Sequence, residues 1–94
     1  MTAREIVLNI AVNLGRLSRW VSEGKVNRIE QFIEDTENYI GELENVERAK
    51  KFEKTFHRFK ISFEKLKKSK RFDYDWAEEA LTWANILSHR AKLA

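Results

Sequence analysis

The two histidines of this chain, His57 and His89, are the first residues to consider for catalysis or metal binding. Glu53 and His57 are four residues apart, and Glu64 falls on nearly the same face of a helix, so these groups could ligate a metal ion. Helical bundles that bind two metals use Glu-x-x-His pairs with further carboxylates from facing helices. The chain offers no second pair of this kind, and we interpret Glu53 and His57 as a polar pair within one helix.

The sequence also shows no nucleophile and base at a spacing that would bring them together. Ser88 and His89 are adjacent in sequence, and adjacent residues on a helix do not face each other. The sequence contains no glycine-rich phosphate loop, no His-Glu-x-x-His motif and no cysteine. We therefore expect no catalytic residue, no metal and no cofactor, and a protein that is not an enzyme.

The charged residues are divided unevenly along the chain. Residues 30–47 contain seven acidic side chains and no basic one, whereas residues 48–71 contain eleven basic side chains and two acidic ones. Five of these cations fall on one outward stripe, about 27 Å long at the rise of an α-helix. This basic stripe consists of Lys50, Lys54, Arg58, Lys65 and Lys68. Such a row can follow a nucleic-acid backbone and release its counterions.

The basic stripe has a second interpretation, as a solvated helix face that the acidic segment partly neutralises. An acidic helix beside a basic one is a common way to fix helix pairing. The net charge of the chain is only +3, and no aromatic residue lies on the stripe to stack on bases. Ile61 is the one apolar residue among these cations. We favour the solvated face and keep phosphate binding as the alternative.

The first helical segment carries more apolar surface than one buried face needs. Leu8, Val12 and Gly15 lie opposite its inward-facing residues, with Ala11 alongside. An apolar patch on a protein surface usually marks an interface. We expect a second copy of the chain, or another protein, to cover Leu8, Ala11, Val12 and Gly15. The alternative is a central helix that is contacted on both sides within one chain.

The elements that position these residues are helices of one domain, residues 1–94. The chain is 43% apolar, which suffices for a core, and it has no proline and only three glycines, which favours helices joined by short connections. The longest apolar run, residues 6–14, is far shorter than the roughly 20 residues of a membrane helix. The absence of cysteine suits a reducing compartment. We expect a cytoplasmic protein that does not contact a membrane.

Apolar spacing and capping signals predict four helical segments. Thr2 opens the first with a capping box, and Gly24 ends it. The second segment is expected to start near Asn27 and the fourth at Asp73 or Asp75. The expected inward-facing residues are Ile6, Ile10, Leu14, Leu17 and Val21 in the first; Ile29, Ile33, Thr36, Ile40 and Leu43 in the second; Phe52, Phe56, Phe59, Phe63 and Leu66 in the third; and Trp76, Ala80, Trp83, Leu87 and Ala91 in the fourth.

The joint between the second and third segments leaves two folds open. From Leu43 to Phe52 the apolar positions advance by three, which drifts by about 60° per step around a helix. A turn at Glu44–Asn45, with Asn45 as the N-cap of the third helix, removes this drift. The result is an all-α, up-down-up-down four-helix bundle with short connections, which we favour. The alternative is one long helix over residues 27–69, giving three helices completed by dimerisation.

The missing catalytic groups and the second apolar face indicate a function in binding. We expect a non-enzymatic protein-protein interaction module that forms homo-oligomers. The alternative is a nucleic-acid-binding accessory protein that uses the basic outer face of the third helix. Salt-sensitive binding to RNA or DNA distinguishes the two.

Overall fold

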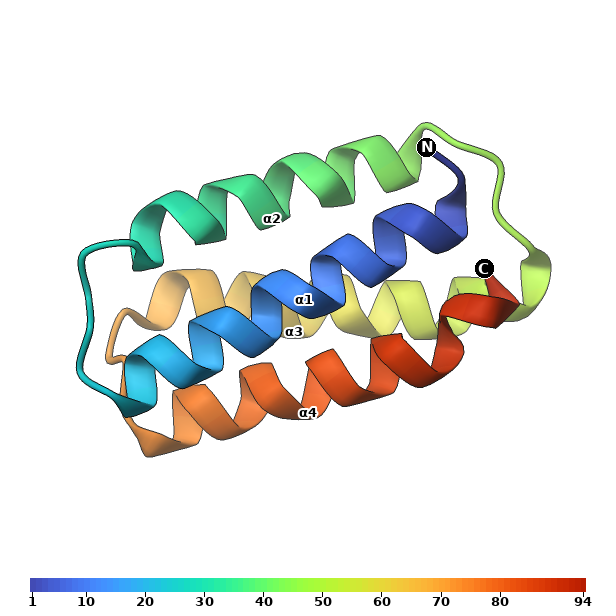
Figure 1. The fold of residues 1–94 in the computed structure, drawn as a ribbon. Coiled ribbons are helices and arrows are strands. Elements are labelled where there is room, and N and C mark those ends of the chain that lie inside the picture. Colours follow the sequence, from blue (N-terminus) through green and yellow to red (C-terminus); the bar gives the residue numbers. More distant parts are fainter.

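Four antiparallel helices form the protein, and the computed structural model describes all residues, 1–94. They are α1 (Ala3–Ser22), α2 (Ile29–Glu44), α3 (Glu53–Ser69) and α4 (Tyr74–Arg90). Single 3₁₀ turns, η1 (Lys50–Phe52) and η2 (Ala91–Leu93), precede α3 and follow α4. Successive helices run in opposite directions, so both chain ends lie at the same end of the bundle (Figure 1). The predicted up-down-up-down four-helix bundle is confirmed.

The joint between α2 and α3 is a turn, and the alternative of one long helix is wrong. The prediction that Asn45 caps the third helix is also wrong, because this residue closes α2 instead. Its backbone N–H donates to the carbonyl of Glu42, and its side-chain amide donates to the carbonyl of Gly41 (3.1 Å each). The chain then continues without helical structure before η1 and α3 begin. Both carbonyls belong to the last turn of α2, where the helix leaves acceptors unpaired.

Arg48 holds this connection in place. Its guanidinium donates to the carbonyl of Leu43 and pairs with the carboxylate of Glu53 (Nε–Oε1 2.9 Å). The same group lies 4.9 Å from the ring centroid of Phe56. Further along, the N–H of Ala49 donates to the carbonyl of the C-terminal residue at 2.8 Å. The connection is therefore tied to both α3 and the chain end.

The other helix starts agree with the sequence in two cases out of three. Thr2 forms the expected capping box with Glu5, and this hydrogen bond lowers the pKa of the Glu5 carboxyl. Asp73 caps α4 by accepting from the backbone N–H of Trp76 at 2.9 Å. The second helix begins at Ile29, two residues after the expected start near Asn27, and no side chain caps it.

The core confirms the predicted inward-facing residues of the first three helices, all of which are buried. Gly24 follows α1 with the expected left-handed backbone (φ +71°). In α4 one residue departs from the prediction: Trp83 is only partly buried, and Ala77 and Ala84 join the core on either side of it. None of the helices combines the length and the apolar composition that a membrane-spanning segment needs.

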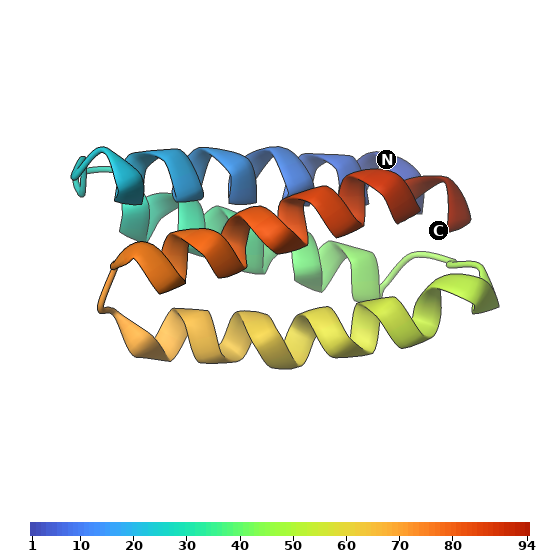
Figure 2. The ribbon, with the colours of Figure 1, turned by 90° about the horizontal axis from the view of Figure 1, so that it is seen from below.

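The helices differ in how closely they approach one another. Small residues let α1 and α4 come close, and the hydroxyl of Ser18 donates to the carbonyl of Ala77 across their contact at 2.8 Å. On the other side of α4, the rings of Phe59 and Trp83 meet with centroids 5.5 Å apart and hold α3 at a greater distance. Figure 2 shows α4 between α1 and α3. Because large side chains separate α3 from its neighbours, grooves border α3 along the surface.

Candidate anion-binding face

The basic stripe is a set of free cations on the outside of α3 and η1. All five of its residues are exposed, and none of them forms an ion pair. Ile61 lies among them with 48% of its surface exposed, as the spacing predicted. Phe56, Phe59 and Phe63 occupy the opposite face of the helix in the core. The aromatic seam thus fixes which way the cations point, and they point to solvent.

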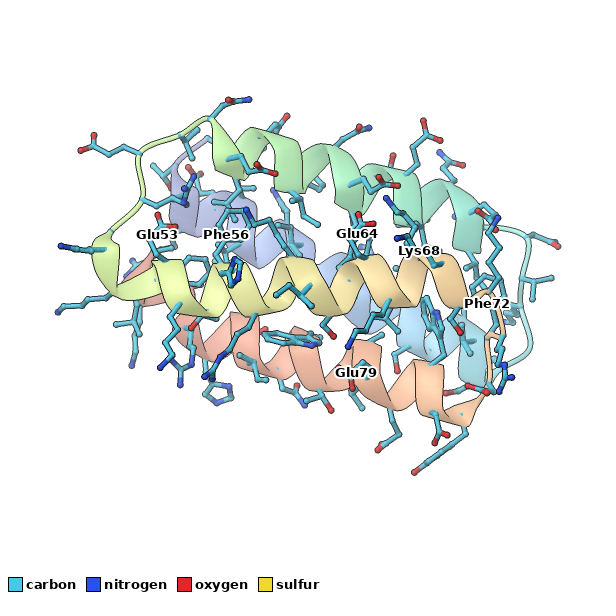
Figure 3. The ribbon with its side chains drawn as sticks, turned by 180° about the vertical axis from the view of Figure 1, so that it is seen from behind. Glu53, Phe56, Glu64, Lys68, Phe72 and Glu79 are labelled. Atoms are coloured by element: carbon cyan, nitrogen blue, oxygen red, sulfur yellow. The ribbon has the colours of Figure 1, made fainter.

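The lysines of α3 that face α2 have a different environment. Lys67 pairs with Glu64 on its own helix (2.9 Å) and with Glu37 on α2 (3.0 Å), while Lys60 lies 4.0 Å from Glu44. Hydrogen bonds to Glu64 and Glu37 raise the pKa of Lys67, and the bond from Lys67 lowers the pKa of Glu64. The acidic segment therefore neutralises this side of α3. Figure 3 shows Glu64 on that side and Glu79 on α4 across the helix.

We call the hollow between these two helices the α2–α3 groove. It has a volume of about 260 Å³. Its lining consists of Glu37, Ile40, Gly41, Glu44, Lys60, Phe63 and Glu64. Carboxylates outnumber ammonium groups in this lining, and the ion pairs described above span it.

The hollow on the other side of α3 gathers cations from two helices. This α3–α4 groove, about 350 Å³ in volume, is lined by Lys51, Lys54, Thr55, Arg58, Trp83, Ile86 and Arg90. Four of the seven residues are cationic and none is acidic. Arg90 reaches over from α4, and one of its guanidinium nitrogens donates to the hydroxyl of Thr55 at 3.3 Å. A region of concentrated positive charge with no internal counterion attracts anions.

The α3–α4 groove changes character toward the other end of the bundle. A neighbouring hollow contains Arg58, Lys65 and Arg71, but also the carboxylates of Asp73, Asp75 and Glu79. There the hydroxyl of Ser62 donates to Glu79 at 2.8 Å, and the indole N–H of Trp83 donates to both. The uncompensated charge is therefore concentrated at the end where α3 begins and α4 ends.

Sequence reasoning identified two residues of the α3–α4 groove, Lys54 and Arg58, and missed the others that give it its shape. Lys51 belongs to the basic run of residues 48–71 but lies outside the predicted stripe. Trp83 was expected in the core, and Arg90 belongs to a different helix. Only the antiparallel pairing of α3 and α4 brings Arg90 and Trp83 to the start of α3, and no local pattern encodes it. The basic run was the one signal that could have pointed here.

The predicted interface on α1 is only partly accessible. Leu8 and Val12 are 41% and 50% exposed, but Ala11 is 5% exposed and belongs to the core, so it cannot contribute to an outer interface. The reason is that α1 is contacted on two sides within the chain, by α2 and by α4, as in the alternative arrangement for this helix. Gly15 is half-buried, and a Cβ at this position would meet no atom within 4 Å.

The histidines do not assemble a reactive site. Glu53 pairs with Arg48 and not with His57, which is exposed. The ring of His89 contacts the carbonyl of Asn85 at 2.8 Å, and the hydroxyl of Ser88 donates to a carbonyl one turn earlier. Nowhere do three His, Asp or Glu side chains gather in a way that could hold a metal ion.

No protein family, no curated protein and no solved structure matches this chain. The fold and site define a four-helix bundle whose charges are segregated, with carboxylates on α2 and free cations on α3 and the end of α4.

Proposed function

We propose that this protein is a non-enzymatic nucleic-acid-binding protein whose basic stripe contacts the phosphate backbone. What supports the proposal is the contrast within one helix. Lys60 and Lys67 form ion pairs with carboxylates of α2, whereas the five stripe residues are exposed and have no ion-pair partner. Lys51 and Arg90 extend the same charge across the α3–α4 groove. The stripe cations on the far side take no part in pairing α3 with α2 and are available to an external anion.

The small net charge of +3 does not weaken the proposal. The acidic helix α2 and the helix α4 lie on opposite sides of the bundle, which is 19 Å across (Figure 1). At physiological ionic strength, charges more than about 8 Å apart through solvent are largely screened. A polyanion on the α3–α4 groove therefore experiences the nearby cations far more strongly than the carboxylates of α2.

Self-association through α1 is the second candidate, and Leu8 and Val12 are the residues that favour it. With Ala11 in the core, however, the exposed apolar surface of this helix is reduced to these two side chains among polar neighbours. A stable interface buries about 1,200–2,000 Å² in total. The patch alone is too small for that, so we place backbone binding first.

The test is binding of a fluorescently labelled RNA and a DNA of mixed sequence, measured by anisotropy at low and high salt. Replacing all five stripe residues by Gln changes the net charge from +3 to −2. The matched control replaces five exposed cations elsewhere by Gln and gives the same net charge. These are Arg4, Arg16, Arg19, Lys25 and Arg28.

We expect the stripe variant to lose on the order of 100-fold in affinity at low salt and the control to lose much less. The slope of log K against log salt should be about −3.5 to −4.5 for five phosphate contacts. Equal losses in both variants would mean that net charge, not the stripe, drives binding. No binding at low salt, together with a dimer that Leu8→Glu with Val12→Glu dissociates into folded monomer, would replace this function by self-association.

A further inference from the structure

The α3–α4 groove combines four cations with an aromatic wall, which a plain basic helix lacks. Trp83 and Ile86 from α4 provide the apolar part of the lining, and Lys51, Lys54, Arg58 and Arg90 provide the charge. A nucleotide offers both matching groups, an anionic phosphate and, across the sugar, an aromatic base whose flat face can stack. Proteins that bind single strands use this combination, a cationic groove with an aromatic side chain on which a base stacks.

Trp83 is held in place before any ligand arrives. Its ring packs on Phe59, with centroids 5.5 Å apart and the planes at 57°. Its indole N–H donates to Ser62 at 2.8 Å and to Glu79 at 3.1 Å, two residues that line the neighbouring hollow. The polar edge of the indole is thus satisfied away from the α3–α4 groove, and the remaining ring surface is free to line it. A fixed ring binds a base with little loss of side-chain entropy.

The volume of the groove and the ring of Trp83 that lines it favour a single strand over a duplex. A volume of about 350 Å³ lies at the lower end of pockets for small ligands, roughly 300–1,000 Å³, and suits one nucleotide. In a duplex the base faces are covered by their neighbours, so an aromatic side chain in a groove cannot stack on them. Only an unpaired base can be splayed out to reach Trp83.

We propose that the α3–α4 groove is a nucleotide-binding subsite for single-stranded nucleic acid. One backbone phosphate lies among Lys51, Lys54, Arg58 and Arg90, and the adjoining base stacks on Trp83 and Ile86. This inference rests on the proposed function and adds to it the class of nucleic acid and the residues contributed by α4.

The experiment compares three anions of equal length on the same protein: oligo(dT), a DNA duplex and inorganic polyphosphate, which carries charge but no bases. Tryptophan fluorescence and affinity are measured together. We expect oligo(dT) to bind most tightly and to quench the fluorescence. In Trp83→Leu, which removes the aromatic ring but keeps an apolar side chain, the quenching should disappear and the affinity for oligo(dT) should fall roughly 10-fold, with little change for polyphosphate. Trp20→Phe, which alters an indole that packs on Phe32, is the control and should keep both properties.

Arg90→Gln tests the groove without touching the aromatic wall. Because Arg90 is exposed and lies on α4, its loss should weaken oligo(dT) binding only if the ligand occupies the groove. Arg19→Gln, an exposed arginine on α1, is the matched control and should bind as the wild type does. A melting curve of each variant verifies that it is folded, so the arginine pair keeps the test valid even if Trp83→Leu loses stability.

The outcomes separate this inference from the proposed function. If the three anions bind equally and the fluorescence does not change, the subsite is wrong while backbone binding stands. If none of them binds at low salt, both are wrong. If vesicles containing phosphatidylserine bind more tightly than oligo(dT) and compete with it, the groove is a site for lipid headgroups and the inference is overturned.

Discussion

The two grooves beside α3 contain similar numbers of charged residues but use them differently. In the α2–α3 groove the lysines of α3 meet glutamates of α2, and the charges bind the two helices together. In the α3–α4 groove two lysines and two arginines face each other with no carboxylate among them. Placing like charges close together does not stabilise a fold, because the charges repel one another. The difference indicates that the first groove serves stability and the second is available for a ligand.

The largest expected effect on stability comes from removing the ring of Phe59, which packs against one lining residue of each groove. Phe59 is fully buried and contacts Phe63 toward α2 and Trp83 toward α4. Phe59→Ala should lower the free energy of unfolding by about 3–5 kcal/mol, as is usual for emptying a large aromatic site. Ile61→Ala, two residues away and exposed, should change it by less than about 0.5 kcal/mol. Chemical denaturation measures both, and equal effects would contradict the assignment of faces on α3.

A pair of arginines tests the comparison most directly. Arg48 donates to the carbonyl of Leu43 and pairs with Glu53, so Arg48→Gln should cost about 1.5–3 kcal/mol of stability. Arg58 has no such partner, and Arg58→Gln should change stability by less than about 0.5 kcal/mol, or raise it slightly by relieving repulsion. The same two variants in the binding assay should show the reverse order of effects. A large loss of stability in Arg58→Gln would mean that this cation is structural.

A smaller effect, here a gain in stability, is expected from replacing the glycine of the α2–α3 groove. Gly41 lies inside α2, and a Cβ at this position would meet no atom within 4 Å. Gly41→Ala should therefore stabilise the protein by about 0.5–1 kcal/mol, because alanine restricts the unfolded chain and favours the helix. Gly24→Ala should instead destabilise it, since the backbone there is left-handed (φ +71°). Thermal melts of the two variants should shift in opposite directions.

The smallest effect concerns the pH dependence of the ion pairs on the α2 side. Because the pKa of Glu64 is lowered, its contribution to stability is present above the ordinary value of 4.5 and is lost as the pH falls through the lowered pKa. Because the pKa of Lys67 is raised, its contribution is complete below the ordinary value of 10.5 and is lost as the pH rises through the raised pKa. The difference in melting temperature between wild type and Lys67→Gln should be greatest between these limits. A difference that persists unchanged at lower pH would show that the pair does not contribute.

The segments that could be predicted most reliably are those in which one local rule decides the structure. The spacing of Phe52, Phe56, Phe59 and Phe63 predicted a buried seam, and the capping box at Thr2 predicted the start of α1. The connection between α2 and α3 shows where such rules fail. Asn45 suits a helix start by its residue type, but it serves as the cap at the end of α2. Sequence alone cannot choose between the two, because both satisfy unpaired backbone groups with the same side chain.

By itself the sequence determined the helical class, the inward face of each helix and the existence of the basic stripe. Each of these follows from periodicity, since residues that recur every three or four positions share one helix face. The tertiary structure alone decided what lies beside the stripe. Helix packing buries Ala11 and pairs Lys60 and Lys67 with carboxylates of α2. It also brings Arg90 and Trp83 into the same groove as Lys54. Such contacts join residues far apart in the chain: the Arg90–Thr55 hydrogen bond spans 35 positions and the Ser18–Ala77 hydrogen bond spans 59. They depend on which helices pack together, which no local pattern specifies.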